Sequence, residues 1–224
     1  YMRNHTNHKL FEFSRKNKIS DLNNIISDID YVYHLAGVNR VNDINLFQEI
    51  NYGLTKHLCE IISSNKKTKL IFASSKQAFL NNPYGVSKRK AEYICKELRN
   101  SNGNKIFILR LPGIYGRGCK PNYNSVVATF CFNIANDIDI KIIDKNKSIE
   151  LIYINDLCRH FIKLLDLTDF SFEEENLVGD NITIEELANL IKMFKHKIDN
   201  KNNFYIKSEF QKNLFETFKS YITL

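Results

Sequence analysis

A tyrosine and a lysine stand four residues apart in the segment YGVSK, as Tyr84 and Lys88, directly after Pro83. Proline is favoured in the first turn of a helix, and residues four apart lie on one helical face. We therefore expect the two side chains to be neighbours, and a lysine charge beside Tyr84 to lower the pKa of its phenol. A tyrosine of this kind can exchange a proton with a substrate oxygen. The alternative is a solvated helix face, because this spacing is common by chance.

The elements that must position these residues alternate along the chain. Short apolar or alternating runs predict strands at 8–14, 31–35, 69–73, 105–111, 140–143 and 149–154. Amphipathic spacing predicts helices at 20–28, 43–65, 83–100, 124–136, 155–167, 183–196 and 209–222. Alternation of this kind predicts an α/β fold with a parallel sheet covered on both faces.

Candidate site residues follow the predicted strands. In an open parallel sheet, ligands bind beyond the carboxyl ends of the strands. The residues that follow the strands at 8–14, 31–35, 69–73 and 105–111 include Arg15, Ala36, Gly37, Ser74, Ser75, Pro112 and Gly113. Since these segments point to one edge of the sheet, together they predict a binding site more strongly than Tyr84 and Lys88 alone.

Composition limits the class of partner. The net charge of +7 favours anionic partners, which include nucleotides as well as nucleic acids, and the lysines are scattered as on a solvated surface. The five cysteines show no Cys-x-x-Cys spacing, which indicates free thiols in a reducing compartment.

His5 and His8 lack a third ligand, so we expect no metal site. No apolar run is long enough for a membrane span and no signal peptide is visible, so we expect a soluble cytoplasmic protein.

Four segments resemble the extended short-chain dehydrogenase/reductase family: HLAGVNR (34–40), FASSKQA (72–78), NPYGVSK (82–88) and RLPGIYG (110–116). The run at 119–137 resembles the bacterial capsule and O-antigen sugar branch of that family. The resemblance covers essentially the whole chain. It implies a Rossmann-like, doubly wound parallel sheet in one incomplete domain over 1–224. Within it, 8–115 would lie mainly on the cofactor side, and 116–224 would form a small substrate-side lobe.

The resemblance also implies catalytic roles. Ser75 would hydrogen-bond the substrate carbonyl, and Tyr84 would donate a proton to its oxygen. Lys88 would hold the cofactor ribose and depress the pKa of Tyr84, and Asn51 would orient the lysine. Taken singly, Ser75 could instead cap a turn, and Asn51 could be a polar residue on an exposed helix face.

Cofactor and substrate contacts follow from the same resemblance. Besides Tyr84 and Lys88, the cofactor would meet Leu35, Ala36, Gly37, Leu111 and Pro112. Arg15 stands where an arginine suits the 2′-phosphate of NADPH and a carboxylate would suit NADH, so NADPH is favoured, with a solvated basic turn as the alternative. A UDP-sugar would meet Asn39, Arg40, Lys120, Asn122 and Asn124, although surface charge and helix capping by Asn124 or Ser125 are the alternatives.

The chain also departs from the family pattern. None of the eight glycines form the Gly-x-x-Gly-x-x-Gly turn that binds the pyrophosphate, so we expect the first strand and glycine loop to be missing and the chain to be a fragment. The metal-binding cupin domain typical of this branch would also be missing. Gly113 replaces an Asn that contacts substrate in relatives.

Three functions remain open. The first is NADPH-dependent reduction of a 4-keto UDP-2-acetamido-2,6-dideoxyhexose in capsule or O-antigen synthesis. The second is an NAD-dependent nucleotide-sugar epimerase or dehydratase. The third is an inactive truncated relative or a nucleic-acid-binding derivative of the fold, although no RNA-binding motif supports the latter. By analogy with the family, helices 43–65 and 83–100 would form a homodimer.

Overall fold

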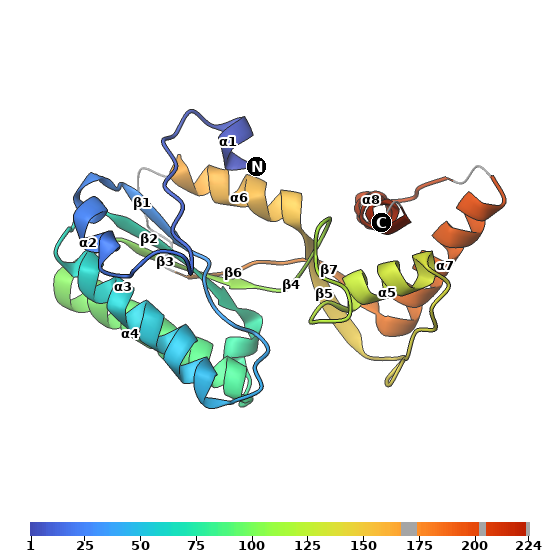
Figure 1. Ribbon diagram of the computed structural model, residues 1–224, viewed down its shortest axis with the longest axis horizontal. Coiled ribbons are helices and arrows are strands. Elements are labelled where there is room, and N and C mark those ends of the chain that lie inside the picture. Colours follow the sequence, from blue (N-terminus) through green and yellow to red (C-terminus); the bar gives the residue numbers. More distant parts are fainter. Residues whose placement is uncertain (167–173, 202–204, 223–224) are drawn as a thin grey trace. The chain divides into compact units, whose positions relative to one another are not determined.

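The computed structural model describes residues 1–166, 174–201 and 205–222 (Figure 1). The chain forms two compact units. Unit 1 comprises Tyr1–Leu111 and Ile162–Leu177, and unit 2 comprises Pro112–Phe161 and Val178–Leu224. Helix α6 (Ile154–Leu165) begins in unit 2 and ends in unit 1.

Unit 1 is built on a parallel sheet with the strand order β1-β2-β3-β6. Its strands are β1 (Tyr31–His34), β2 (Lys69–Ser75), β3 (Ile106–Leu111) and β6 (Glu174–Asn176). Its helical segments are α1 (Met2–His5), α2 (Asp21–Ile25), η1 (Ile26–Asp28), η2 (Phe47–Gly53), α3 (Leu54–Ser63), η3 (Lys76–Phe79) and α4 (Pro83–Asn102). The structure thus confirms the predicted α/β, Rossmann-like class.

Helices α3 and α4 lie side by side along one face of this sheet (Figure 1). Ile62 of α3 and Ala91 of α4 pack with Phe72 of β2, and all three are fully buried. Each of the six residues of β3 is buried, as expected for a central strand of a parallel sheet. The largely apolar sequence of β3, interrupted only by Arg110, therefore places this strand in the interior of unit 1.

Helix α4 starts and stops where its sequence specifies. The side chain of Asn82 accepts a hydrogen bond from the Gly85 amide at 2.7 Å, and Pro83 occupies the first turn. Gly103 ends the helix at φ 72°, a left-handed conformation that glycine adopts without strain. The predicted helix at 83–100 is confirmed and extends to Asn102.

Unit 2 has a small mixed sheet with the order β4-β5-β7, in which β4 pairs parallel and β7 antiparallel to β5. Its elements are β4 (Gly113–Tyr115), α5 (Val126–Ala135), β5 (Ser148–Tyr153), β7 (Asp180–Thr183), α7 (Ile184–Asp199) and α8 (Glu209–Ile222). Phe130, Leu187, Phe194 and Phe218 form the centre of its core. Thr183 and Glu186 form a capping box that starts α7.

Two predicted strands are wrong. Residues 8–14 have the alternating pattern of a strand but are exposed, and no described segment pairs with them. A strand needs a ladder partner, which local sequence cannot supply. Residues 140–143 also form no strand: Ile140 and Ile142 pack on the core of unit 2 while Ile143 is exposed, so their alternation reflects one-sided burial.

The other differences between prediction and structure concern the ends of two helices and three short strands. The predicted helix at 43–65 begins at Phe47, and its first part, η2, is π-helical. The predicted helix at 155–167 ends at Leu165, and residue 167 lies outside the described part of the chain. Strands β4, β6 and β7 were not predicted, because three or four residues are too few to show an alternating pattern.

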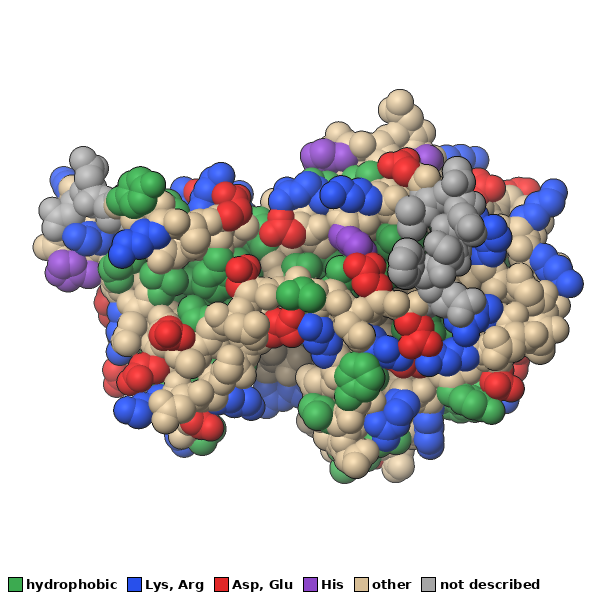
Figure 2. All heavy atoms as spheres, turned by 180° about the vertical axis from the view of Figure 1, so that it is seen from behind, with side chains coloured by type: hydrophobic (Ala, Val, Ile, Leu, Met, Phe, Trp, Pro, Cys, Tyr) green, Lys and Arg blue, Asp and Glu red, His purple; other side chains and the backbone are tan. Residues whose placement is uncertain are grey.

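The charged side chains are interspersed on the surface. On the face shown in Figure 2, lysine and arginine side chains lie among aspartate and glutamate side chains. This arrangement agrees with the interpretation of the scattered lysines as solvated surface charge.

We predict that Gly85→Ala strongly destabilises unit 1. A Cβ atom at Gly85 would stand 2.1 Å from the Gln77 carbonyl oxygen and 2.7 Å from that of Leu80, both of them backbone atoms. The expected loss is about 1–3 kcal/mol of unfolding free energy, measured by urea denaturation. Gly53→Ala is the matched control, since its nearest neighbour would be 3.8 Å away. Equal stability of the two variants would show that α4 does not need this close approach.

Candidate active site

The end of β2 and the first turn of α4 bring two hydroxyl groups together. Ser75 is the last residue of β2, and its side chain accepts a hydrogen bond from the Gln77 amide at 3.2 Å, which starts η3. The chain then turns back through Asn82 into α4, and Ser75 hydrogen-bonds the side chain of Tyr84. Ser75 therefore does cap a turn, but the same residue also contacts the tyrosine predicted to act with it.

The pKa of Tyr84 is raised, contrary to the prediction. Tyr84 is half-buried, with its ring 5.9 Å from that of Phe47. Burial raises its pKa, and the hydrogen bond with Ser75 opposes that shift. The Lys88 ammonium points to the Ala73 carbonyl, and burial outweighs the effect expected from lysine spacing alone. Tyr84 therefore keeps its proton at neutral pH.

Lys88 lies one helical turn after Tyr84 on α4 and is buried, with 5% of its surface exposed. Its Nζ donates to the Ala73 carbonyl at 2.7 Å and stands 4.3 Å from the centre of the Phe72 ring. Burial lowers the pKa of Lys88 to about 8, against the opposing effects of Cys95 and Glu92. Lys88 is therefore charged at neutral pH but loses its proton far more easily than an exposed lysine.

Asn51 lies in the π-helical segment η2 and is 2% exposed. Its Oδ1 accepts from the Val38 amide at 2.8 Å, and its Nδ2 donates to the Val38 carbonyl at 2.9 Å and to the Ser87 hydroxyl at 3.0 Å. Its contact with α4 is therefore Ser87, the neighbour of Lys88. Asn51 ties the loop after β1 to the helix that carries Tyr84 and Lys88.

The loop after β1 passes close to Asn51. A Cβ atom at Gly37 would stand 2.9 Å from the Asn51 Oδ1, so glycine allows this close approach. Leu35 is 59% exposed, and Ala36 and Gly37 are also exposed. These residues follow a strand parallel to β2, and an exposed apolar loop at that position can contact a flat ligand.

The other predicted residues are divided between the two units. In unit 1, Leu111 is buried opposite Ser75 in the sheet, Asn39 and Arg40 are exposed, and Arg15 lies in an exposed turn that follows no strand. Pro112, Lys120, Asn122 and Asn124 belong to unit 2.

Three of the predicted residues of unit 2, Lys120, Asn122 and Asn124, lie in the segment just before α5. Asn122 has φ 53° and donates to the Asn133 side chain at 3.2 Å, and the Lys120 ammonium stands 5.6 Å from the Tyr123 ring centre. Ser125, not Asn124, caps α5 by accepting from the Ala128 amide at 3.2 Å.

The sequence analysis did not identify the charged residues next to this site. Glu92 and Arg110 form a buried ion pair at 2.6 Å that also contacts Ser74. One signal was available, since Glu92 lies four residues after Lys88 and eight after Tyr84 and so shares their helical face. The arginine partner, on β3, could not be identified from local spacing.

Residues 3–178 match the NAD dependent epimerase/dehydratase family, and the chain belongs to this family. Over 94% of its length it is 36% identical to a Pseudomonas aeruginosa protein named UDP-2-acetamido-2,6-beta-L-arabino-hexul-4-ose reductase, of which it spans 57%. The family membership confirms the resemblance seen in the sequence.

Solved structures show the same fold. The capsular polysaccharide assembling protein CapF from Staphylococcus aureus matches 99% of the chain with a TM-score of 0.83 and 30% identity, and the chain spans 60% of it. A UDP-glucuronic acid 4-epimerase from Bacillus cereus, in complex with NAD, matches 93% of the chain and 78% of its own length with a TM-score of 0.79 and 21% identity.

Two further features concern only the described residues. None of their helices is both long and apolar enough to cross a membrane. They also contain no cluster of three or more His, Cys, Asp or Glu side chains that could hold a metal ion.

We predict that Lys88 titrates near pH 8 and that this affects stability. Because its pKa is about 8 in the folded protein and 10.5 ordinarily, the unfolded chain binds more protons between these values. The free energy of unfolding should therefore rise with pH over this window in the wild type, relative to Lys88→Met. Denaturation of both proteins at pH 7 and pH 10 measures the difference. A pH-independent difference would show that Lys88 has an ordinary pKa.

Proposed function

We propose that the chain carries the catalytic residues of an NADPH-dependent reductase of a 4-keto UDP-2-acetamido-2,6-dideoxyhexose. The observation that carries this proposal is the hydrogen bond between Ser75 and Tyr84, with the buried Lys88 one helical turn further along α4. The name of the Pseudomonas aeruginosa relative supports the substrate, and that of the Staphylococcus aureus relative supports a role in capsule assembly. Both relatives are longer proteins, of which this chain spans 57% and 60%.

In this proposal Ser75 and Tyr84 act on the same ketone oxygen. Ser75 donates a hydrogen bond that holds the oxygen, and Tyr84 donates the proton that completes the alcohol. The raised pKa of Tyr84 suits a proton donor, because a reductase needs this residue protonated at the start of the cycle. The charge of Lys88 below about pH 8 then favours the phenolate that remains.

The residues around Lys88 fit the nicotinamide and ribose part of the cofactor. An ammonium has three donors, and the Ala73 carbonyl accepts from Lys88, so donors remain for ribose hydroxyls. Leu35, Ala36 and Gly37 would lie against the cofactor, with Leu111 and Pro112 as the further contacts. When bound, the reduced nicotinamide supplies the hydride.

The remaining assignments concern the cofactor's 2′-phosphate and the UDP-sugar. Arg15 would hold the 2′-phosphate that distinguishes NADPH from NADH, since its side chain lies in an exposed turn and a guanidinium suits a phosphate. Asn39, Arg40, Lys120, Asn122 and Asn124 would contact the UDP-sugar. No residue is assigned to the pyrophosphate, because the sequence contains no Gly-x-x-Gly-x-x-Gly turn. A homodimer through α3 and α4 and a cytoplasmic location complete the proposal.

We predict that Tyr84→Phe lowers kcat by roughly 10²–10⁴-fold with little change in NADPH affinity, because it removes only the proton donor. NADPH oxidation with the 4-keto UDP-sugar measures turnover, and fluorescence titration measures cofactor binding. Tyr93→Phe is the control, since Tyr93 lies on the same helix but is 60% exposed.

Turnover near the wild-type rate in Tyr84→Phe would remove Tyr84 as the acid. A wild-type chain that converts a UDP-sugar while its nicotinamide is returned unchanged would instead support the epimerase alternative. A chain that binds neither NADPH nor NADH would contradict the reductase proposal for these 224 residues.

A further inference from the structure

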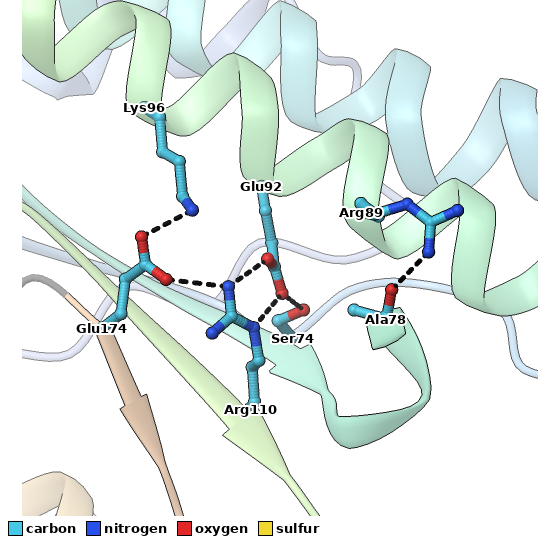
Figure 3. Close-up of polar contacts among 7 residues, drawn as sticks. All are labelled: Ser74, Ala78, Arg89, Glu92, Lys96, Arg110 and Glu174. Atoms are coloured by element: carbon cyan, nitrogen blue, oxygen red, sulfur yellow. Dashed lines mark hydrogen bonds and ion pairs between the residues drawn. The ribbon is translucent and has the colours of Figure 1, made fainter. Parts of the chain in front are cut away.

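One buried carboxylate joins three elements of unit 1 (Figure 3). The Glu92 Oε1 accepts from the Ser74 hydroxyl at 2.5 Å and from the Arg110 Nε at 2.9 Å, and the Oε2 accepts from the Arg110 Nη2 at 2.6 Å. The side chains of Glu92 and Arg110 are only 5% and 8% exposed. These bonds link α4 to the ends of β2 and β3.

An outer ion pair completes the group of charges. The Arg110 Nη2 also donates to Glu174 at 2.8 Å, and Glu174 pairs with Lys96 at 2.5 Å (Figure 3). The Arg110 guanidinium lies 4.8 Å from the centre of the Phe79 ring, in η3. The carboxylates of Glu92 and Glu174 thus face the cations of Arg110 and Lys96.

The positions of these residues connect them to the proposed site. Ser74 directly precedes Ser75, and it stands opposite Arg110 in the β2–β3 register. Glu92 follows Lys88 by four residues, on the same face of α4. The Glu92–Ser74 bond therefore connects the strand end that carries Ser75 to the helix that carries Lys88.

We propose that Glu92, through its bonds to Ser74 and Arg110, is a positioning residue that fixes Ser75 and Lys88 relative to one another. This inference rests on the proposed function for its catalytic consequence. The alternative is that the ion pair only stabilises the fold. Buried ion pairs add little net stability compared with apolar residues, so stability alone is a weak reason for the bonds of Glu92 to Ser74 and Arg110 at this place.

The titration of Lys88 shows whether Glu92 acts on this lysine, and it needs no assay of turnover. Groups from two helical turns and two strands face it: Glu92 and Cys95 on α4, His34 on β1, and the Phe72 ring and Ala73 carbonyl on β2. Burial lowers the pKa of His34 to about 3, and the hydrogen bond with Cys59, together with burial, raises the pKa of Cys95, so both side chains are uncharged at neutral pH. Within this set, Glu92 is the carboxylate, and it acts to raise the pKa of Lys88.

The first test is the titration of Lys88 by side-chain NMR, with Lys88→Arg to assign its signal. In Glu92→Gln we expect the midpoint to fall by about 1 pH unit, because the carboxylate no longer favours the ammonium. Lys96→Ala is the matched control. It removes only the outer ion pair, whose side chains are 33% and 31% exposed, and should leave the midpoint unchanged. An unchanged midpoint in Glu92→Gln would overturn the proposal.

The second test separates positioning from folding, and it does not depend on Glu92→Gln being stable. Ser74→Ala keeps the ion pair but removes the bond between the strand end and the helix. We expect kcat to fall roughly tenfold to a hundredfold, because Ser75 is displaced, while KM and the midpoint of thermal unfolding stay close to wild type.

Wild-type kcat in Ser74→Ala would contradict the positioning role, as would an equal loss in Lys96→Ala. If the wild-type chain shows no turnover, the proposed reductase function fails. The Lys88 titration then still decides whether Glu92 acts on Lys88.

Discussion

The site depends on how closely the first turn of α4 approaches the backbone of η3. At Gly85 this approach leaves no space for a Cβ atom, which would stand 2.1 Å from the Gln77 carbonyl oxygen. The Asn82 cap starts the helix at this point, and Ser75 begins the turn on the other side. Tyr84 can hydrogen-bond Ser75 only because the strand end and the helix start meet here. A short, tightly packed turn thus places a proton donor beside a second hydroxyl.

Polar bonds then connect α4 to each neighbouring strand end. Lys88 donates to the Ala73 carbonyl on β2, Asn51 joins Val38 to Ser87, and Glu92 holds Ser74 and Arg110. These side chains are buried, so leaving any of them unpaired costs free energy. In this arrangement of α4 and the sheet each of these buried groups has a hydrogen-bond partner, which makes it more favourable than arrangements that would leave them unpaired. The geometry that suits proton transfer is therefore built into the core of unit 1.

Local sequence predicts those parts of the site that local structure determines. The helix was predicted from Pro83, and its functional face from the spacing of Tyr84 and Lys88. The largely apolar sequence of β3 helped to predict the parallel sheet. The pKa of Tyr84 was predicted wrongly, because burial depends on the assembled fold. The predicted strand at 8–14 failed because a strand needs a partner, and Arg110 was missed because it pairs with Glu92 across 18 residues of sequence. Pairing between distant segments is thus what the sequence patterns did not reveal.

The most direct test of the reductase proposal follows the hydrogen atom that is transferred. The chain would be incubated with the 4-keto UDP-sugar and NADPH deuterated at C4 of the nicotinamide, and the product analysed by mass spectrometry. The proposal predicts an alcohol that carries one deuterium, with one NADPH oxidised for each product formed. A converted sugar without deuterium, or no conversion when the cofactor is bound, would contradict the assignment of Ser75, Tyr84 and Lys88 as the centre of a reductase.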